Sequence, residues 1–217
     1  MRITKLEFGS LLTYSPYDMS DMAKSSRNVR SDLKGDKFIL DDPPVLMSKY
    51  LAQGIKTNLV KYPFALFFES SPILVPTPKS SLVKPETLWV PQRLARALAQ
   101  KQLGKAVKEC LVRVKPLPKS STTYTEDRPK AFQHYESLEV RWRETSKPKE
   151  ILLVDDIVTR GATLLGAANR LIDTFPNAHI RAFAMIRTMS GQSIFVRITD
   201  PCRGWIELRG NDSYRIP

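Results

Sequence analysis

The chain has 217 residues, of which 42% are hydrophobic and 26% charged, and its formal net charge is +12 at pH 7. These values fit a single globular α/β domain spanning 1–217 better than two domains, and the positive charge favours anionic ligands. No apolar run approaches the length of a membrane span, and the first residues lack the apolar core of a secretion signal. We therefore expect a cytoplasmic protein without a membrane partner. Two cysteines are too few for a disulfide framework and give no metal-ligand spacing.

The N-terminal part of the chain alternates between apolar and polar stretches. Apolar residues within 3–8 predict a first strand, and 14–42 is polar and basic with a short apolar run at 38–40. A helix is predicted for 43–60, starting at the paired prolines, because apolar residues recur there at helical spacing. The apolar run 64–68 predicts either a strand or a buried extension of that helix.

Polar donors follow the next predicted strand. Residues 72–76 include two β-branched apolar side chains, and Lys79 and Ser80 come just after this strand and its prolines. Ligands bind outside the carboxyl ends of strands in open α/β sheets, so these donors are candidates for anion binding. The alternative is a proline-rich connection whose polar residues face solvent.

A long polar loop separates the middle elements from the C-terminal part. A helix is predicted for 89–103 and a strand for 107–114, ahead of the loop 115–130. Loops of this length are usually functional lids or disordered linkers, and both readings stay open. Lys119 and Arg128 are the cations of this loop with a candidate function.

Residues 131–150 carry little pattern. His134 is expected at the surface, because a lone histidine is more often a surface group than an acid or base. A short strand is predicted for 139–142, and a polar connection follows it.

The most informative stretch runs from Ile151 to Thr163. Its first four residues form a continuous apolar run, as a parallel strand covered on both faces requires. Asp155 and Asp156 follow, and two neighbouring carboxylates repel each other unless sugar hydroxyls, a hydrated metal ion or another cation compensate them. The alternative is that both acids simply cap the next helix.

The turn after the two aspartates has the composition of a phosphate site. Residues 159–163 lie where a strand ends and a helix begins, so free backbone N–H groups and the helix dipole attract anions there. Thr159 and Thr163 supply hydroxyl donors, and Gly161 permits a positive φ and close approach of a ligand. A phosphate site beside acceptors for paired hydroxyls describes a pocket for ribose 5-phosphate.

The C-terminal part completes the predicted sheet. A strand is expected at 180–186, joined to the preceding strand by a right-handed helical crossover. Apolar residues within 195–208 predict one or two edge strands. The expected fold class is therefore α/β, with a mostly parallel twisted sheet and helices on both faces.

The run VDDIVTRGAT at 154–163 resembles the phosphoribosyl pyrophosphate (PRPP) motif of type I phosphoribosyltransferases, in which two acids precede a T-x-G-x-T loop. The wider stretch 72–188 is similar to the ComF-like, competence-associated branch of that family. The resemblance implies the type I phosphoribosyltransferase fold, with terminal segments, about 1–42 and 189–217, as a small hood. It also implies transfer of ribose 5-phosphate from PRPP to a nitrogenous base, with Mg²⁺ as cofactor and pyrophosphate as product.

The same resemblance implies roles for the central residues. The 5-phosphate of PRPP would lie on the turn formed by Thr159, Arg160, Gly161, Ala162 and Thr163. The ribose hydroxyls would be held, directly or through Mg²⁺, by the metal-ligand candidates Asp155 and Asp156.

Residues outside the central motif would complete the reaction. Lys79 and Ser80 would bind the pyrophosphate, and the loop carrying Lys119 and Arg128 would close over it and exclude water. The catalytic roles would thus fall to Asp155, Asp156, Lys119 and Arg128.

Some features depart from the family pattern. Arg160 stands where a small hydroxyl residue is common, and the cysteine-rich zinc segment of many ComF-like proteins is missing. The acceptor base is not legible from the sequence. Dimers are common in the family, so a homodimer is among the expected assemblies.

A different class of function stays open. The same fold would serve a non-catalytic sensor of PRPP or nucleotides, or a nucleic-acid-binding protein of DNA uptake or repair. The net charge of +12 and the ComF-like resemblance favour this alternative.

Overall fold

The computed structural model describes residues 1–82, 87–118, 128–189 and 195–217, so Lys119 lies outside the described residues. Its centre is a seven-stranded sheet in the order β11-β10-β1-β9-β8-β4-β5. The strands are β1 (Lys5–Tyr14), β4 (Ile73–Pro76), β5 (Ala106–Val107), β8 (Glu150–Val158), β9 (His179–Thr188), β10 (Thr199–Arg209) and β11 (Asp212–Ile216).

Most of this sheet is parallel. β5, β4, β8, β9 and β1 run in one direction, and the outer strands β10 and β11 continue the sheet in antiparallel pairing. The N-terminal strand β1 therefore lies inside the sheet, between β9 and β10. The expected α/β class with a mostly parallel sheet is confirmed, as are the first strand and the strands of the tail.

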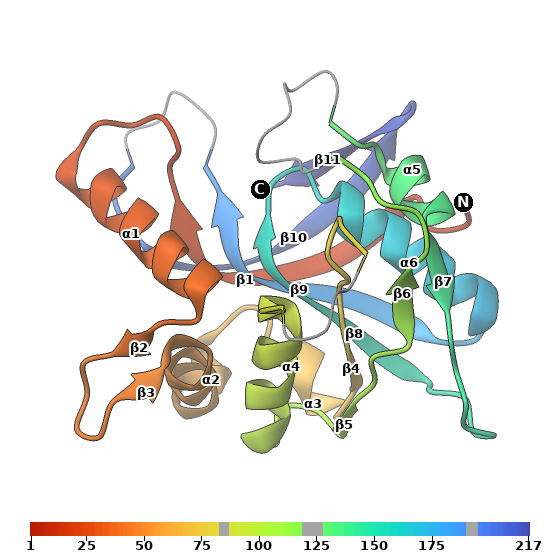
Figure 1. Cartoon of the computed structure of the whole chain (residues 1–217), viewed down its shortest axis with the longest axis horizontal. Coiled ribbons are helices and arrows are strands. Elements are labelled where there is room, and N and C mark those ends of the chain that lie inside the picture. The colour runs from red at the N-terminus through yellow and green to blue at the C-terminus, as the bar shows by residue number, and fades with distance from the viewer. Residues whose placement is uncertain (83–86, 119–127, 190–194) are drawn as a thin grey trace.

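Helices cover both faces of the sheet (Figure 1). One face packs against α2 (Met47–Asn58), α3 (Leu66–Glu69) and α4 (Val90–Gln100), with α1 (Asp21–Gly35) at the edge of the same core. The other face packs against α5 (Ala131–Glu136) and α6 (Ala162–Thr174). A 3-10 turn and two small antiparallel sheets complete the framework: η1 (Leu59–Lys61), β2 (Phe38–Ile39) with β3 (Val45–Leu46), and β6 (Leu111–Arg113) with β7 (Leu138–Val140).

The alternation of strand side chains explains the continuous apolar run of β8. Leu152 and Val154 enter the core shared with α4, whereas Ile151 and Leu153 enter the core shared with α6. All four side chains are at most 2% exposed. A strand buried on both faces needs apolar residues at every position, as the sequence predicts.

Several boundaries differ from the sequence-based predictions. The helix predicted from 43 begins at Met47, because Val45 and Leu46 pair with β2 instead. The run 64–68 ends in the short helix α3, and the strand predicted for 107–114 is split into β5 and β6. The helix α5 was not predicted at all. Strand β8 continues through both aspartates to Val158, so these acids belong to the strand end rather than to a loop.

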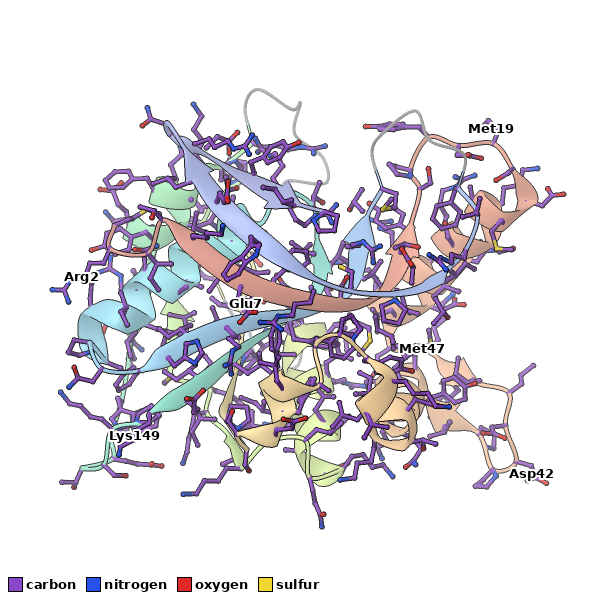
Figure 2. The ribbon with its side chains drawn as sticks, turned by 180° about the vertical axis from the view of Figure 1, so that it is seen from behind. Arg2, Glu7, Met19, Asp42, Met47 and Lys149 are labelled. Atoms are coloured by element: carbon purple, nitrogen blue, oxygen red, sulfur yellow. The ribbon has the colours of Figure 1, made fainter. Side chains whose placement is uncertain are left out.

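A buried carboxylate joins β1 to both of its neighbours. Glu7, near the middle of the face seen in Figure 2, is 7% exposed. Its Oε2 lies 3.2 Å from Nε of Arg181 on β9, and its Oε1 pairs with Arg203 on β10. These contacts fix β1 inside the sheet and thereby position the carboxyl end of β1 beside that of β9.

Within the residues that the structure describes, no helix has both the length and the apolar composition needed to cross a membrane.

Candidate functional site

A cleft of about 810 Å³ opens at the carboxyl ends of the parallel strands. It is lined by Tyr14 at the end of β1, by Thr188 at the end of β9, and by the segments that follow β4 and β8. Helix α1 forms a further wall. This is the edge at which open α/β sheets bind ligands.

The cleft gathers nearly all of the sequence-predicted site residues. Its lining includes Lys79, Ser80, Arg128, Asp155, Asp156, Thr159, Arg160, Gly161, Ala162 and Thr163. Its described lining also contains seven basic residues and two acidic ones; the basic residues are Arg27, Arg30, Lys34, Lys79, Arg113, Arg128 and Arg160. Such a cleft attracts a ligand with several negative charges.

The two aspartates lie at the floor of the cleft and are held by defined partners. Oδ1 of Asp155 accepts a hydrogen bond from the Asp156 backbone N–H at 2.9 Å, and its carboxylate also accepts from the Thr77 hydroxyl. Oδ1 of Asp156 accepts from the Ile157 N–H at 2.8 Å, whereas Oδ2 lies 2.6 Å from Nζ of Lys34. A lysine from α1 thus supplies the compensating cation that the sequence pattern requires.

Burial and the neighbouring carboxylate raise the pKa of Asp155. Burial first, and then the negative charge of Asp156, raise the pKa of Asp155 to about 7, although the Thr77 hydrogen bond and Lys34 oppose the shift. Near neutral pH Asp155 is therefore protonated for part of the time in the ligand-free protein. A ligand that brings hydroxyl donors or a cation would release this proton.

The raised pKa of Asp155 predicts a pH-dependent stability of the ligand-free protein. The folded state binds this proton more tightly than the unfolded state, so the contribution of Asp155 to the free energy of unfolding falls as pH rises from about 4 to about 7. Urea unfolding of the wild type and of Asp155→Asn across this range measures the contribution. The free energy of unfolding of the wild type minus that of Asp155→Asn should fall as pH rises to about 7 and then level off. A difference that stays constant with pH would contradict the assigned titration.

The turn at 159–163 has the backbone geometry expected of an anion site. Gly161 has φ 87°, precedes the first residue of α6, and makes no side-chain capping hydrogen bond. A Cβ at Gly161 would lie 2.6 Å from Ile206, so the turn packs directly on β10. The Thr159 and Thr188 hydroxyl oxygens lie 3.0 Å apart, which joins the turn to the end of β9. Gly161, Ala162 and Thr163 line the cleft, at the end of α6 where the first N–H groups have no acceptor within the helix.

Strand β11 supports this turn from outside. Arg215 donates from Nε to the Thr159 carbonyl at 2.8 Å and from Nη2 to the Thr188 carbonyl. Arg160 forms an ion pair with Asp212. Arg160 lines the cleft, but its guanidinium is paired with Asp212 of β11. It therefore does not take the place of the small hydroxyl residue that is common at this position in the family motif.

The expectation of a surface histidine at 134 is wrong. His134 is 3% exposed and lines the cleft, because Gly166 lets α5 approach α6 closely. A Cβ at Gly166 would lie 2.6 Å from the Ala131 carbonyl oxygen and 2.7 Å from Cβ of His134. The burial of His134 therefore depends on helix packing that no local pattern reveals.

His134 joins the phosphate turn to a buried arginine. Nη2 of Arg113 lies 3.5 Å from Nδ1 of His134, and Nε2 lies 3.4 Å from the Thr163 hydroxyl. Burial, Arg113 and Arg160 lower the pKa of His134 to about 3, so the ring is neutral. Because arginine can only donate, Nδ1 of His134 accepts from Arg113 and the ring proton is on Nε2. Nε2 then donates to the Thr163 hydroxyl oxygen, and the hydroxyl hydrogen of Thr163 is free to donate into the cleft.

Arg113 also fixes the segment after β4. Its side chain is 3% exposed, its Nε donates to the Lys79 carbonyl at 2.8 Å, and it donates to the Ser137 hydroxyl. Burial lowers the pKa of Arg113 to about 10, which leaves it charged at neutral pH. No carboxylate pairs with it among the described residues. A buried cation without an acid beside a cleft favours an anionic ligand.

Sequence reasoning therefore missed the residues that α1, α5 and β6 contribute. Arg27, Arg30 and Lys34 have a detectable signal, since positions i, i+3 and i+7 share one face of a helix. The polar composition of 14–42 fits a solvated basic surface segment as well as a hood over the acceptor, so the sequence does not assign these cations to the site. Arg113 and His134 have no such signal.

No known family model matches the chain, and a search of curated proteins finds no relative. The site must therefore be interpreted from its own chemistry.

Proposed function

We propose that the protein is a type I phosphoribosyltransferase that transfers ribose 5-phosphate from PRPP to a nitrogenous base and releases pyrophosphate. The observation that carries this proposal is the meeting of an acidic pair and an uncapped glycine turn in one basic cleft. A sugar phosphate with vicinal hydroxyls needs both features, because hydroxyls donate to carboxylates and phosphate accepts from backbone N–H groups. The α/β sheet with helices on both faces is compatible with the fold of that family.

The turn would hold the 5-phosphate. Backbone N–H groups at the start of α6, together with the hydroxyls of Thr159 and Thr163, would donate to its oxygens. The neutral His134 keeps the Thr163 hydroxyl oriented toward the cleft. Arg113 would add positive potential and keep the Lys79 segment in place for the departing pyrophosphate.

Asp155 and Asp156 would accept from the ribose hydroxyls and stabilise positive charge that develops at C1. To do so, Asp156 must share or exchange its contact with Lys34. The ammonium of Lys34 lies where it can then move to an anionic part of the ligand. The cation thus keeps the empty site neutralised and remains available when the site fills.

The donor set also fits a magnesium ion that arrives with the substrate. No cluster of three or more acidic, histidine or cysteine ligands is present among the described residues. Magnesium commonly takes one or two carboxylates and completes its shell with water and substrate phosphates, so Asp155 and Asp156 are sufficient to hold it. When bound, it would neutralise charge on the leaving pyrophosphate.

Isothermal titration with PRPP, with and without Mg²⁺, tests the binding part of this proposal. We expect micromolar affinity that depends on Mg²⁺. A panel of bases assayed for pyrophosphate release then separates an enzyme from a sensor of PRPP. Tight, salt-sensitive DNA binding without affinity for PRPP would overturn the proposal in favour of the nucleic-acid alternative, which the basic cleft and the net charge of +12 also favour.

A further inference from the structure

The order of the strands divides the cleft into regions. β4, β8, β9 and β1 are consecutive neighbours, and neighbouring strands lie about 4.8 Å apart. The proposed phosphate sites follow β8 and β4. The carboxyl end of β1 lies on the other side of β8, about 10 Å from β8 and about 14 Å from β4 by the same spacing. The part of the cleft over β9 and β1 is therefore left for the second substrate.

That region is lined by a different kind of residue. Tyr14, Pro16 and Tyr17 come from the end of β1 and the segment after it, and Arg30 comes from α1. Tyr17 is 74% exposed, and the guanidinium of Arg30 lies 5.2 Å from the centroid of the Tyr14 ring. Flat side chains of this kind favour a planar ligand, which gains contact area by stacking.

Arg30 differs from the neighbouring cations because its guanidinium has no acceptor among the described residues. Its Nε is buried and makes no hydrogen bond within the described part of the chain. By contrast, Arg27 donates from Nη1 to the carbonyls of Ser15 and Asp18, and Lys34 contacts Asp156. Arg30 lines the cleft, so a ligand there that supplies an acceptor to its guanidinium recovers free energy that unpaired donors cost in the empty protein. A carboxylate or other anionic group suits a guanidinium best, because it accepts charge-assisted hydrogen bonds.

We infer that the acceptor is a planar ring that carries a negative charge, bound against the Tyr14 and Tyr17 wall with Arg30 as its counter-ion. This inference rests on the proposed function, because the position of the ring is set relative to a donor sugar at Asp156. It selects among nitrogenous bases: rings that bear a carboxylate, or that ionise near neutral pH, are preferred over neutral rings of the same shape.

Matched ring pairs provide the test. Nicotinate and nicotinamide, and 6-carboxyuracil and uracil, differ mainly in the presence of a negative charge. Titration of each ring into the protein, and initial rates of pyrophosphate release with PRPP and Mg²⁺, measure the preference. We expect the charged member of a pair to be favoured about tenfold or more in the wild type. Equal binding of charged and neutral rings would overturn the inference without any variant.

Variants of α1 then assign the preference to one side chain. Arg30→Gln should reduce the preference to about twofold or less while PRPP affinity changes by no more than about twofold, and Arg30→Lys should retain part of the preference. Lys24→Gln removes one charge from an exposed position of the same helix, where Lys24 pairs with Asp21, and should leave the preference unchanged. A preference that persists in Arg30→Gln would overturn the assignment.

The two proposals fail in different ways. If the wild type does not bind PRPP, the proposed function is overturned. A preference for charged rings that depends on Arg30 would still support the ring site in that case. PRPP binding without any preference for charged rings would overturn only the ring site.

Discussion

Replacing Asp156 with asparagine is expected to weaken PRPP binding by about tenfold to a hundredfold while the protein stays folded. The side chain is 9% exposed, and its Oδ2 is held by Lys34 rather than by the backbone. A hydrogen bond to a charged group contributes about 1.5–3 kcal/mol, and asparagine keeps the size of the side chain but loses its charge. Isothermal titration in the presence of Mg²⁺ measures the loss.

Two further variants test whether the loss is specific to the carboxylate of Asp156 and how much Lys34 offsets it. Asp32→Asn removes a carboxylate from the outer part of α1, where it pairs with Lys37, and should leave PRPP affinity unchanged. In Asp156→Asn the ammonium of Lys34 is released and can attract the anionic ligand, which offsets part of the loss. Lys34→Met in the same background removes this compensation and should weaken binding further. An Asp156→Asn protein that binds PRPP with wild-type affinity would refute the assigned site.

Replacing Gly161 with alanine is expected to destabilise the protein by about 2–5 kcal/mol and to weaken PRPP binding. A left-handed backbone costs a residue with a Cβ about 1–2 kcal/mol, and overpacking a core typically adds about 1–3 kcal/mol. Both apply here, since Gly161 has φ 87° and its added Cβ would lie 2.6 Å from the fully buried Ile206. The turn must shift to relieve this contact, which misplaces the N–H groups proposed for phosphate. Urea unfolding and PRPP titration measure the two effects.

Gly210→Ala is the matched control for this substitution. Gly210 also has a positive φ, of 58°, but an added Cβ there meets nothing within 4 Å. It should therefore show only the backbone cost of about 1–2 kcal/mol and normal PRPP affinity. Ile206→Val should recover part of the loss in the Gly161→Ala background by making room. Equal effects of the two glycine substitutions would show that contact with Ile206 is unimportant.

The candidate site separates into a part that is local in sequence and a part that is not. Asp155, Asp156 and the turn 159–163 belong to one strand–turn–helix segment, so their spacing predicted that they face one cleft, and the structure brings them there. Lys79 and Ser80 were predicted from their position after a strand, and they reach the same cleft because β4 is the neighbour of β8.

The cations of α1 illustrate the other case. Their residue types were visible in the sequence, yet nothing local distinguished a helix beside the cleft from a solvated basic segment. Leu33 of α1 is fully buried, and this packing turns Lys34 toward Asp156. The contact joins residues far apart in the chain, so its existence depends on how α1 docks.

Side-chain periodicity and local backbone geometry are enough to predict the α/β class, the buried parallel strand β8 with its two aspartates, and the glycine-containing turn after it. Three features appear only in the folded chain: Lys34 contacts Asp156, His134 and Arg113 are buried behind the turn, and Arg30 has no acceptor among the described residues. The physical reason is that burial and pairing depend on contacts between distant segments. Packing of α1 and α5 against the sheet creates these contacts, and no short sequence pattern encodes them.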